Sequence, residues 1–184
     1  MIADTIATRR AVFPAQYNSD PISKEEIETL LKAANWAPTH RRTEPWRFKV
    51  FRGEALNELS EFLGKKYEET ISNYSEFKHK KVMAKPLQSA CVIAICMQRD
   101  PAESVPEWEE VAATAMAVQN MWLAAHELGI GAYWSSPSLR NYLGELVAME
   151  NGERCLGFFY MGKYDGELPA GERKTSISEK TTWV

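Results

Sequence analysis

An apolar run near the middle of this chain of 184 residues most constrains how it can fold. The run extends from Ala90 to Met97 and places no polar side chain on either face of an extended strand. Strands that are apolar on both faces and rich in branched residues lie in the middle of a sheet. The sequence therefore predicts a sheet whose central strand is buried.

Helical patterns occur on both sides of this run in the sequence. The best marked begins with a capping box formed by Ser23 and Glu26 and ends near Trp36, because Pro38 disfavours helix in the residues before it. Helices are also predicted over residues 56–63, 107–128 and 138–148. The segment 107–128 is apolar nearly all round, which predicts a helix that is buried or that also packs against a second subunit.

Two further strands complete the predicted fold. Trp46, Phe48 and Val50 alternate with charged residues, as in a half-buried strand, and residues 156–161 form another apolar run. The order of strands and helices indicates a layered α+β or α/β arrangement. Because no repeat or linker divides the chain, we predict one domain over residues 1–184.

Other parts of the chain lack a regular pattern. Residues 74–86 are charged and poorly periodic, which suggests a mobile lid, and Arg99 falls in a predicted polar turn. The tail from Asp165 onward is polar and contains glycine and proline. We expect Trp183, near its end, to dock against another surface.

The overall charge and hydropathy exclude some classes of function. The formal net charge is −3 and the pI is near 5.7, so the chain has no broad basic field for nucleic acid. No stretch approaches the roughly 20 apolar residues that cross a bilayer, and the first residues lack a signal-peptide pattern. We therefore expect a soluble cytoplasmic protein that binds neither nucleic acid nor a membrane.

The sequence indicates no metal site. The three histidines lack the spacing of zinc ligands, and Cys91, Cys96 and Cys155 lack CxxC spacing. An odd offset directs Cys91 and Cys96 to opposite faces of the predicted central strand. We expect reduced structural thiols and no bound metal.

Two arginines and a stiff loop are the candidates for a binding site. Arg9 and Arg10 are adjacent, and guanidinium groups hold phosphate oxygens in a two-point geometry, although such a pair is also common at a solvated helix end. Residues 37–48 lead from a helix into a strand, and two prolines stiffen a loop that carries His40 and Glu44. Taken alone, this loop also fits a polar surface turn.

Several segments together resemble the nitroreductase family. Thr8-Arg9-Arg10-Ala11-Val12 resembles its TRRS-type start, and Ala37-Pro38 followed by Glu44-Pro45-Trp46-Arg47-Phe48 resembles its APS…QPW loop. Leu128-Gly129-Ile130-Gly131-Ala132-Tyr133-Trp134-Ser135 resembles its GLG segment at a helix exit. The matches follow the same order over most of the chain, which is most similar to the small, compact branch of the family.

The resemblance implies a fold, a cofactor and an activity. The implied fold is α+β, with three layers in which a mainly antiparallel central sheet is flanked by helices, assembled as a homodimer. The implied cofactor is FMN, which accepts hydride from NADH or NADPH and passes it to nitroaromatics, quinones or related acceptors. Ping-pong kinetics are implied because one pocket serves both substrates. No GxGxxG or Walker A motif indicates a separate nucleotide site.

The resemblance also implies site residues, while the flavin itself carries the chemistry. Arg9, Arg10 and the backbone around Ala11, where relatives usually have Ser, would contact FMN, and Arg10 is the best candidate to stabilise the reduced flavin. His40 would reach the flavin bound mainly by the other subunit. The remaining implied contacts are Tyr133, Trp134, Ser135 and Ser136 along the ring system and Arg173 or Lys174 at the phosphate.

Two alternatives remain open at this stage. The same scaffold supports other flavin reactions, such as reductive dehalogenation, enone reduction and oxygen-dependent flavin cleavage. A non-enzymatic flavin-binding redox sensor would keep the phosphate arginines and lose access for a nicotinamide. Glu44, where relatives have Gln, leaves the preference for an acceptor open.

Overall fold

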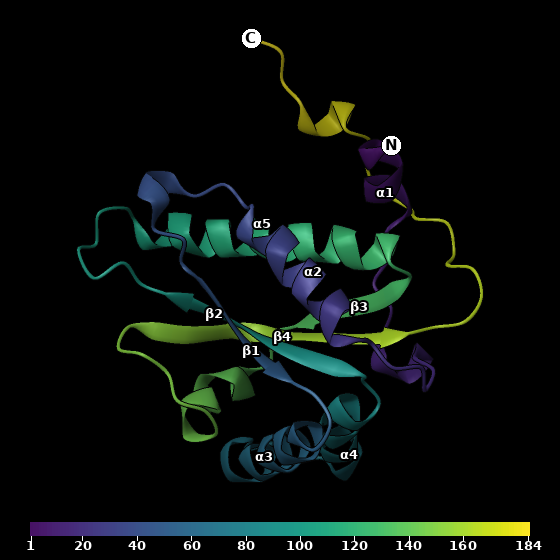
Figure 1. Cartoon of the computed structure of the whole chain (residues 1–184), viewed down its shortest axis with the longest axis vertical. Helices are drawn as coiled ribbons and strands as arrows, with labels where there is room; N and C mark the ends of the chain where they lie inside the picture. Colours follow the sequence, from purple (N-terminus) through teal and green to yellow (C-terminus); the bar gives the residue numbers. More distant parts are fainter.

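One antiparallel sheet of four strands organises the molecule. The computed structural model describes residues 1–184, and its strands pair in the order β1-β2-β4-β3 (Figure 1). The strands are β1 (Trp46–Phe51), β2 (Cys91–Gln98), β3 (Ile130–Ser135) and β4 (Glu153–Lys163). The apolar run forms β2 in the interior of the sheet, and every residue from Cys91 to Met97 is buried, as predicted.

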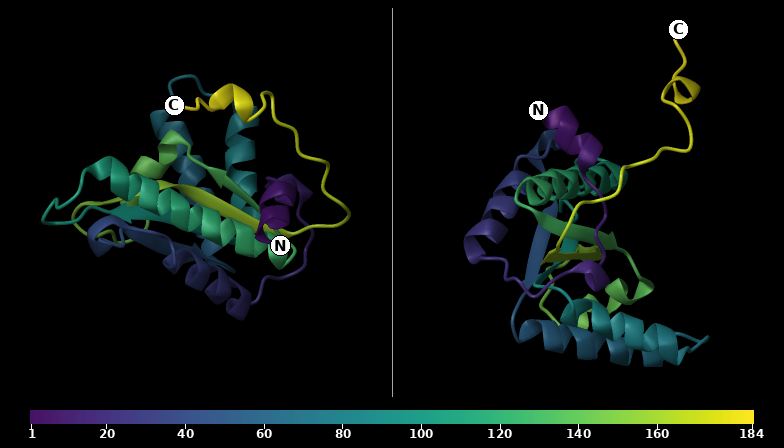
Figure 2. Two further views of the ribbon diagram at one scale, coloured as in Figure 1. Left: turned by 90° about the horizontal axis from the view of Figure 1, so that it is seen from above. Right: turned by 90° about the vertical axis from the view of Figure 1, so that its right-hand side faces the viewer.

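Helices cover both faces of this sheet, as Figures 1 and 2 show. The helices are α1 (Ile2–Thr8), α2 (Lys24–Asn35), α3 (Ala55–Thr70), α4 (Glu76–Leu87) and α5 (Glu107–Glu127), with 3-10 turns η1 (Pro14–Gln16), η2 (His40–Arg42), η3 (Ser138–Glu145) and η4 (Ser178–Lys180). On one face, α2 and α5 form a core that includes Leu30 and Met121. On the other, α3 and η3 contribute Leu59 and Leu143 to a second core, and α4 packs against α3. This arrangement confirms the predicted α+β fold with three layers.

Helices α2 and α5 begin and end at the residues that local sequence signals predict. The Glu26 amide donates to Ser23 Oγ at 3.1 Å, and the Ser23 amide donates to Glu26 Oε2 at 2.8 Å, so the capping box is complete. α2 ends at Asn35, and α5 ends at Glu127. Gly129 follows α5 with a φ of 64°, the left-handed conformation that favours glycine after a helix.

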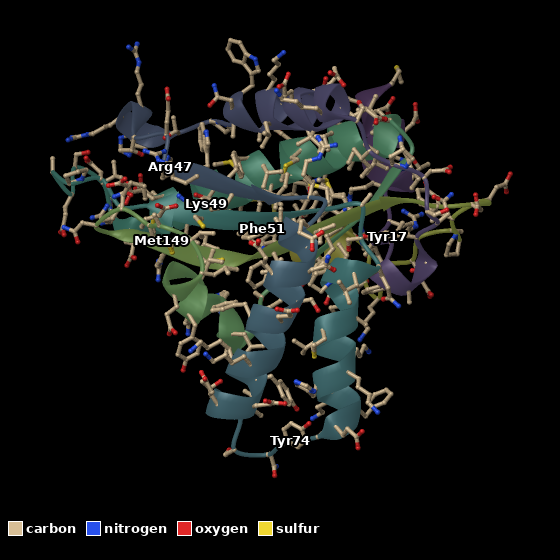
Figure 3. The ribbon with its side chains drawn as sticks, turned by 60° about the horizontal axis from the view of Figure 1, so that its bottom comes forward. Tyr17, Arg47, Lys49, Phe51, Tyr74 and Met149 are labelled. Atoms are coloured by element: carbon tan, nitrogen blue, oxygen red, sulfur yellow. The ribbon has the colours of Figure 1, made fainter.

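The segment 74–86, predicted to be irregular, lies mostly within helix α4. Ser75 caps it by accepting a hydrogen bond from the Lys78 amide at 3.4 Å, and Ser60 Oγ of α3 donates to the Met83 carbonyl at 2.7 Å. Figure 3 shows Tyr74 at the turn between the two helices. The prediction was wrong because α4 buries only Pro86 fully, so its charged, exposed side chains hide the helical period.

Smaller differences between the predicted and the observed structure concern short elements, the edge strands and the tail. The predicted helix over residues 138–148 forms only η3, and the sequence did not predict α1 or β3. Val50 is exposed because β1 is an edge strand. The tail is irregular except for η4 and projects from the body (Figure 1), and Trp183 is 93% exposed, so it does not dock within this chain.

The cysteines lie as the sequence predicts. All three are buried free thiols. Cys91 belongs to the core under α2 and α5, whereas Cys96 belongs to the core under α3, so β2 directs them to opposite faces. None of the helices combines the length and hydropathy needed to cross a bilayer.

Candidate functional site

The strongest candidate site is a cluster of cationic side chains at the C-terminal end of α5. Arg9 and Arg10 follow α1, and the backbone after them is held at β3 because the Val12 amide donates to the Ala132 carbonyl at 3.0 Å. The tail returns to the same place, since Arg10 Nε donates to the Pro169 carbonyl at 2.9 Å. The segment after α1 and the part of the tail near Pro169 therefore meet beside the edge of the sheet.

Arg9 has the most unusual environment in this cluster. Its guanidinium carbon lies 4.5 Å from the centroid of the Trp122 ring, and its Nε is buried without a hydrogen-bond partner. Burial lowers the pKa of Arg9, and the nearby positive charges of Arg173 and Arg10 lower it further. No acidic side chain forms an ion pair with any of these three arginines. Three cations with an unused buried donor fit an anionic group such as a phosphate.

Arg10 contributes to the cluster mainly by holding the tail in place. Its Nη1 donates to the carbonyls of Ala7 at 2.7 Å and Arg9 at 2.8 Å, in addition to the bond from Nε to Pro169. Gly171 packs so closely against the guanidinium that a side chain there would collide with it. Arg10 thus fixes the part of the tail that precedes Arg173, and Arg173 is the tail cation whose charge acts on Arg9.

The residues predicted along the flavin ring occupy the edge strand β3, but their side chains diverge. Tyr133 points toward the α3 side, and its ring centroid lies 4.6 Å from that of Phe13. Lys85 Nζ lies 5.3 Å from the centroid of the Tyr133 ring. Trp134 points toward the α5 side, and its buried Nε1 has no partner. Ser135 ends the strand and Ser136 is exposed beyond it. Alternation along the strand therefore prevents Tyr133 and Trp134 from sharing one surface.

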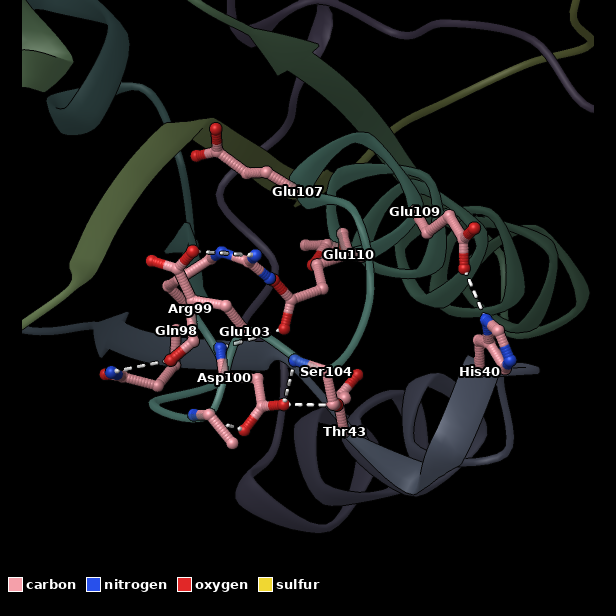
Figure 4. A network of polar contacts seen from close by, with 12 residues as sticks. His40, Thr43, Gln98, Arg99, Asp100, Glu103, Ser104, Glu107, Glu109 and Glu110 are labelled. Atoms are coloured by element: carbon pink, nitrogen blue, oxygen red, sulfur yellow. Dashed lines mark hydrogen bonds and ion pairs between the residues drawn. The ribbon is translucent and has the colours of Figure 1, made fainter.

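His40 lies in the loop before β1, at the other end of α5. Its Nδ1 is 2.6 Å from Glu109 Oε2, and a dashed line marks this contact in Figure 4. Arg41, Arg42 and Glu44 in this loop have φ values of 51°, 55° and 42°, which cost about 1–3 kcal/mol each for residues other than glycine. Such strain persists only where surrounding contacts enforce it and is common at ligand sites.

Arg99 lies beside a polar turn, as predicted, but it also forms an ion pair that the sequence did not predict. Its guanidinium pairs with the carboxylate of Glu110, whose side chain is fully buried, and the Asp100 amide donates to the same carboxylate at 2.9 Å. Hydrogen bonds from Ser104 and Ala102 in turn lower the pKa of Asp100. Figure 4 shows this network at the start of α5. It stabilises the helix that separates His40 from the arginine cluster.

Sequence reasoning missed three residues near these sites. Trp122 and His126 are four positions apart on α5, and both contact the start of the chain, His126 Nε2 lying 2.9 Å from Thr8 Oγ1. The sequence signal that could have found them is a tryptophan and a histidine on the same face of an apolar helix. Lys85 was missed because it falls in the segment interpreted as a lid.

The fold is that of an α+β protein, and the arginine cluster beside the sheet edge is a candidate site for a phosphate-bearing ligand. The Nitroreductase family pattern matches residues 6–163. The chain therefore belongs to the nitroreductase family.

Similar proteins agree with this assignment. YfhC of Bacillus subtilis, provisionally named an NAD(P)H nitroreductase, is 27% identical over 190 aligned residues, which cover 99% of this chain and 93% of YfhC. A nitroreductase-like family protein from Bacillus cereus has a solved structure with a TM-score of 0.84 and 29% identity, covering 100% of this chain and 96% of that one. A provisionally named nitroreductase from Desulfovibrio desulfuricans, solved in complex with FMN, shares the fold with a TM-score of 0.75 at 20% identity, with coverage of 100% and 96%.

Proposed function

We propose that this protein is an FMN-dependent oxidoreductase that transfers hydride from NADH or NADPH to nitroaromatics, quinones or related acceptors. The observation that carries the proposal is the cluster of Arg9, Arg10 and Arg173, which has no acidic partner and leaves the buried Arg9 Nε free. Family membership and the names of similar proteins support the same activity.

FMN fits this site better than FAD does. One cationic cluster suits one phosphate, and no second nucleotide motif occurs in the sequence. Arg9 and Arg173 would hold the phosphate, with the backbone at Ala11 beside them and Arg10 keeping the tail in place. When bound, FMN supplies the acceptance and donation of hydride, so no side chain needs to act as a catalytic acid.

The chain's own residues would orient the ring at the edge of the sheet. Tyr133, Trp134, Ser135 and Ser136 belong to β3 and its exit, next to the segment that carries the arginines. Because the side chains of Tyr133 and Trp134 diverge, we expect the backbone and the outer edge of β3 to provide most of the contacts to the ring. A single pocket would then admit NAD(P)H and the acceptor in turn, which gives ping-pong kinetics.

We further propose a homodimer with His40 at the site of the partner subunit. The body of the molecule exposes apolar side chains along α1 and α5, including Ile2, Ile6, Trp108 and Met116. The tail exposes Ile177 and Trp183 in addition, and Figure 2 shows it reaching away from the body. Burial of these side chains by a second copy would remove them from water, and a two-fold axis would bring each His40 toward the partner's arginine cluster.

The purified protein tests this function directly. We expect flavin absorbance, release of a cofactor with the mass of FMN, and rapid bleaching by NADH or NADPH without oxygen, followed by reoxidation with a nitroaromatic or a quinone. We expect the enzyme in the cytoplasm, where NAD(P)H is available. FAD, or no flavin binding at micromolar concentrations, would contradict the cofactor. Bound FMN that neither nicotinamide bleaches would indicate a redox sensor instead.

A further inference from the structure

A pair of cysteines outside the candidate flavin site is arranged for redox chemistry. Cys96 of β2 and Cys155 of β4 are directly opposite each other in antiparallel register. Both are buried free thiols in the core on the α3 side. Opposite residues of antiparallel strands have Cα atoms about 4.5–5.5 Å apart, within the range of about 4.4–6.8 Å in which a disulfide closes.

A β-bulge creates this pairing. Phe158 belongs to the same core as Cys96, so simple alternation along β4 would direct Cys155 to the opposite face. Between the pair Ile95–Gly157 and the pair Cys96–Cys155, however, β4 contains one extra residue, Leu156. Leu156 packs against the core on the α5 side, and Cys155 thereby turns to face Cys96.

The two thiols differ in how readily they ionise. A hydrogen bond from Cys96 lowers the pKa of Cys155 against the effect of burial, and the charge of Arg140 lowers it further. The same hydrogen bond and burial raise the pKa of Cys96. Cys155 lines a pocket that a small disulfide can enter, whereas Cys96 is fully buried behind it. Because the thiolate is the nucleophile in disulfide exchange, Cys155 is therefore the attacking group and Cys96 the resolving group.

A pocket lined by Arg140, Arg154 and Glu153 borders Cys155, and Glu153 is paired with Lys49 at 2.9 Å. The pocket has a volume of about 340 Å³, and Cys155, Arg140 and Arg154 are among its lining residues. Arg140 donates to the carbonyls of Ser136 at 3.3 Å and Pro137 at 3.2 Å and forms no ion pair. Arg154 pairs with Glu107 at 2.8 Å. Arg140 is therefore the cation beside the thiol that is free to receive a carboxylate.

We propose that Cys96 and Cys155 form a dithiol site that reduces small organic disulfides carrying carboxylates. In the first step the Cys155 thiolate attacks one sulfur of the small disulfide, a mixed disulfide forms, and the expelled thiolate takes up a proton. Cys96 then gives up its proton, its thiolate attacks Cys155 Sγ, and the second small thiolate leaves and takes up that proton. Two protein thiols become one disulfide while one small disulfide becomes two thiols, so atoms and electrons balance.

Oxidised glutathione is the probe for this site, applied to the reduced, full-length protein. After incubation, free thiols are alkylated and the protein is digested with trypsin without reductant. We expect the fragment 155–163 to be linked to the fragment 82–99 through Cys96, with Cys91 alkylated. Because the fragment 82–99 contains both Cys91 and Cys96, the same digest of Cys91→Ser assigns the linked residue. Full alkylation of Cys96 and Cys155 after this treatment would overturn the proposal.

Variants then separate the roles of the two thiols. Cys96→Ser should trap one glutathionyl group on Cys155, Cys155→Ser should trap none, and Cys91→Ser should behave as the unmodified protein, with folding checked by circular dichroism. Arg140→Ala should slow trapping on Cys155 by about tenfold with oxidised glutathione and by less than about twofold with uncharged 2-hydroxyethyl disulfide. An adduct on Cys96 in Cys155→Ser, or equal slowing with both reagents, would contradict the assigned roles.

Discussion

Arg9 and His40 contact opposite ends of α5. The Arg9 guanidinium carbon lies 4.5 Å from the ring centroid of Trp122 near the end of the helix, whereas His40 Nδ1 lies 2.6 Å from Glu109 near its start. At about 1.5 Å per residue, these contacts are about 20 Å apart along the helix axis. In the homodimer that we propose, a two-fold axis across α5 would bring each His40 near the arginine cluster of the partner, although the two groups lie far apart within one chain.

Mixing two inactive variants tests this cross-subunit arrangement. Arg9→Ala and His40→Ala should each have low activity as homodimers. After subunit exchange, each mixed dimer should contain one doubly altered site and one intact site, so a statistical mixture should recover roughly a quarter of full activity. Activity assays of the mixture, with exchange verified by mass spectrometry, provide the measurement. Absence of recovery after verified exchange would contradict the cross-subunit arrangement, because it would mean that Arg9 and His40 of the same chain serve the same site.

Arg99→Ala should destabilise the protein much more than Arg52→Ala. Arg99 compensates the charge of Glu110, whose side chain is fully buried, whereas Arg52 is exposed and forms no ion pair. Removing one partner of a buried ion pair leaves an uncompensated charge. We expect a fall in melting temperature of several degrees for Arg99→Ala and little change for Arg52→Ala, measured by calorimetry. Similar values for both variants would show that the pair contributes little.

Gly162→Ala should destabilise the sheet edge by about 1–3 kcal/mol through overpacking. A Cβ at Gly162 would collide with the ring of Tyr17, whose hydroxyl donates to the carbonyls of Val12 at 2.8 Å and Tyr160 at 3.0 Å and cannot easily move. Gly144→Ala is the matched control, because the nearest atom there is at an ordinary distance of 3.6 Å. Urea denaturation of both variants should separate them, and equal midpoints would contradict the predicted clash.

Glu26→Gln should lower stability at pH 7 by up to about 1 kcal/mol, with a difference that shrinks in acid. A hydrogen bond from Lys163 at 2.7 Å, followed by one from the Ser23 amide, lowers the pKa of Glu26. A carboxylate with a lowered pKa contributes stability above its unfolded value of about 4.3, and this contribution is lost as pH falls through the folded pKa. Thermal unfolding from pH 7 to pH 3 measures the effect. Glu28→Gln, on the exposed face of α2, should show a small difference throughout.

Residues whose local pattern agrees with their tertiary environment were predictable from the sequence. The capping box at Ser23 and the doubly apolar run at Ala90–Met97 fixed α2 and β2, because each pattern permits few conformations. α4 and β3 were missed because their stability comes from neighbouring elements rather than from a pattern of their own.

The candidate site was predictable only in part. The resemblance pointed to Arg9 and Arg10 as candidates, but not to their different environments. Arg9 packs on Trp122 and Arg10 binds the tail at Pro169, and each of these partners is more than 100 positions away in the sequence. Nothing in the sequence near Arg9 reports that its Nε would be buried without a partner.

Titration with FMN tests the central claim, that the arginine cluster holds the phosphate of this cofactor. The apoprotein, Arg9→Ala and Arg52→Ala are titrated at equal ionic strength, and quenching of flavin fluorescence reports binding. Arg9→Ala should weaken binding by about 10- to 100-fold, the equivalent of about 1.5–3 kcal/mol for a lost hydrogen bond to a charged group. Arg52→Ala should bind as the unmodified protein does. Equal affinities of Arg9→Ala and Arg52→Ala for FMN would contradict the account.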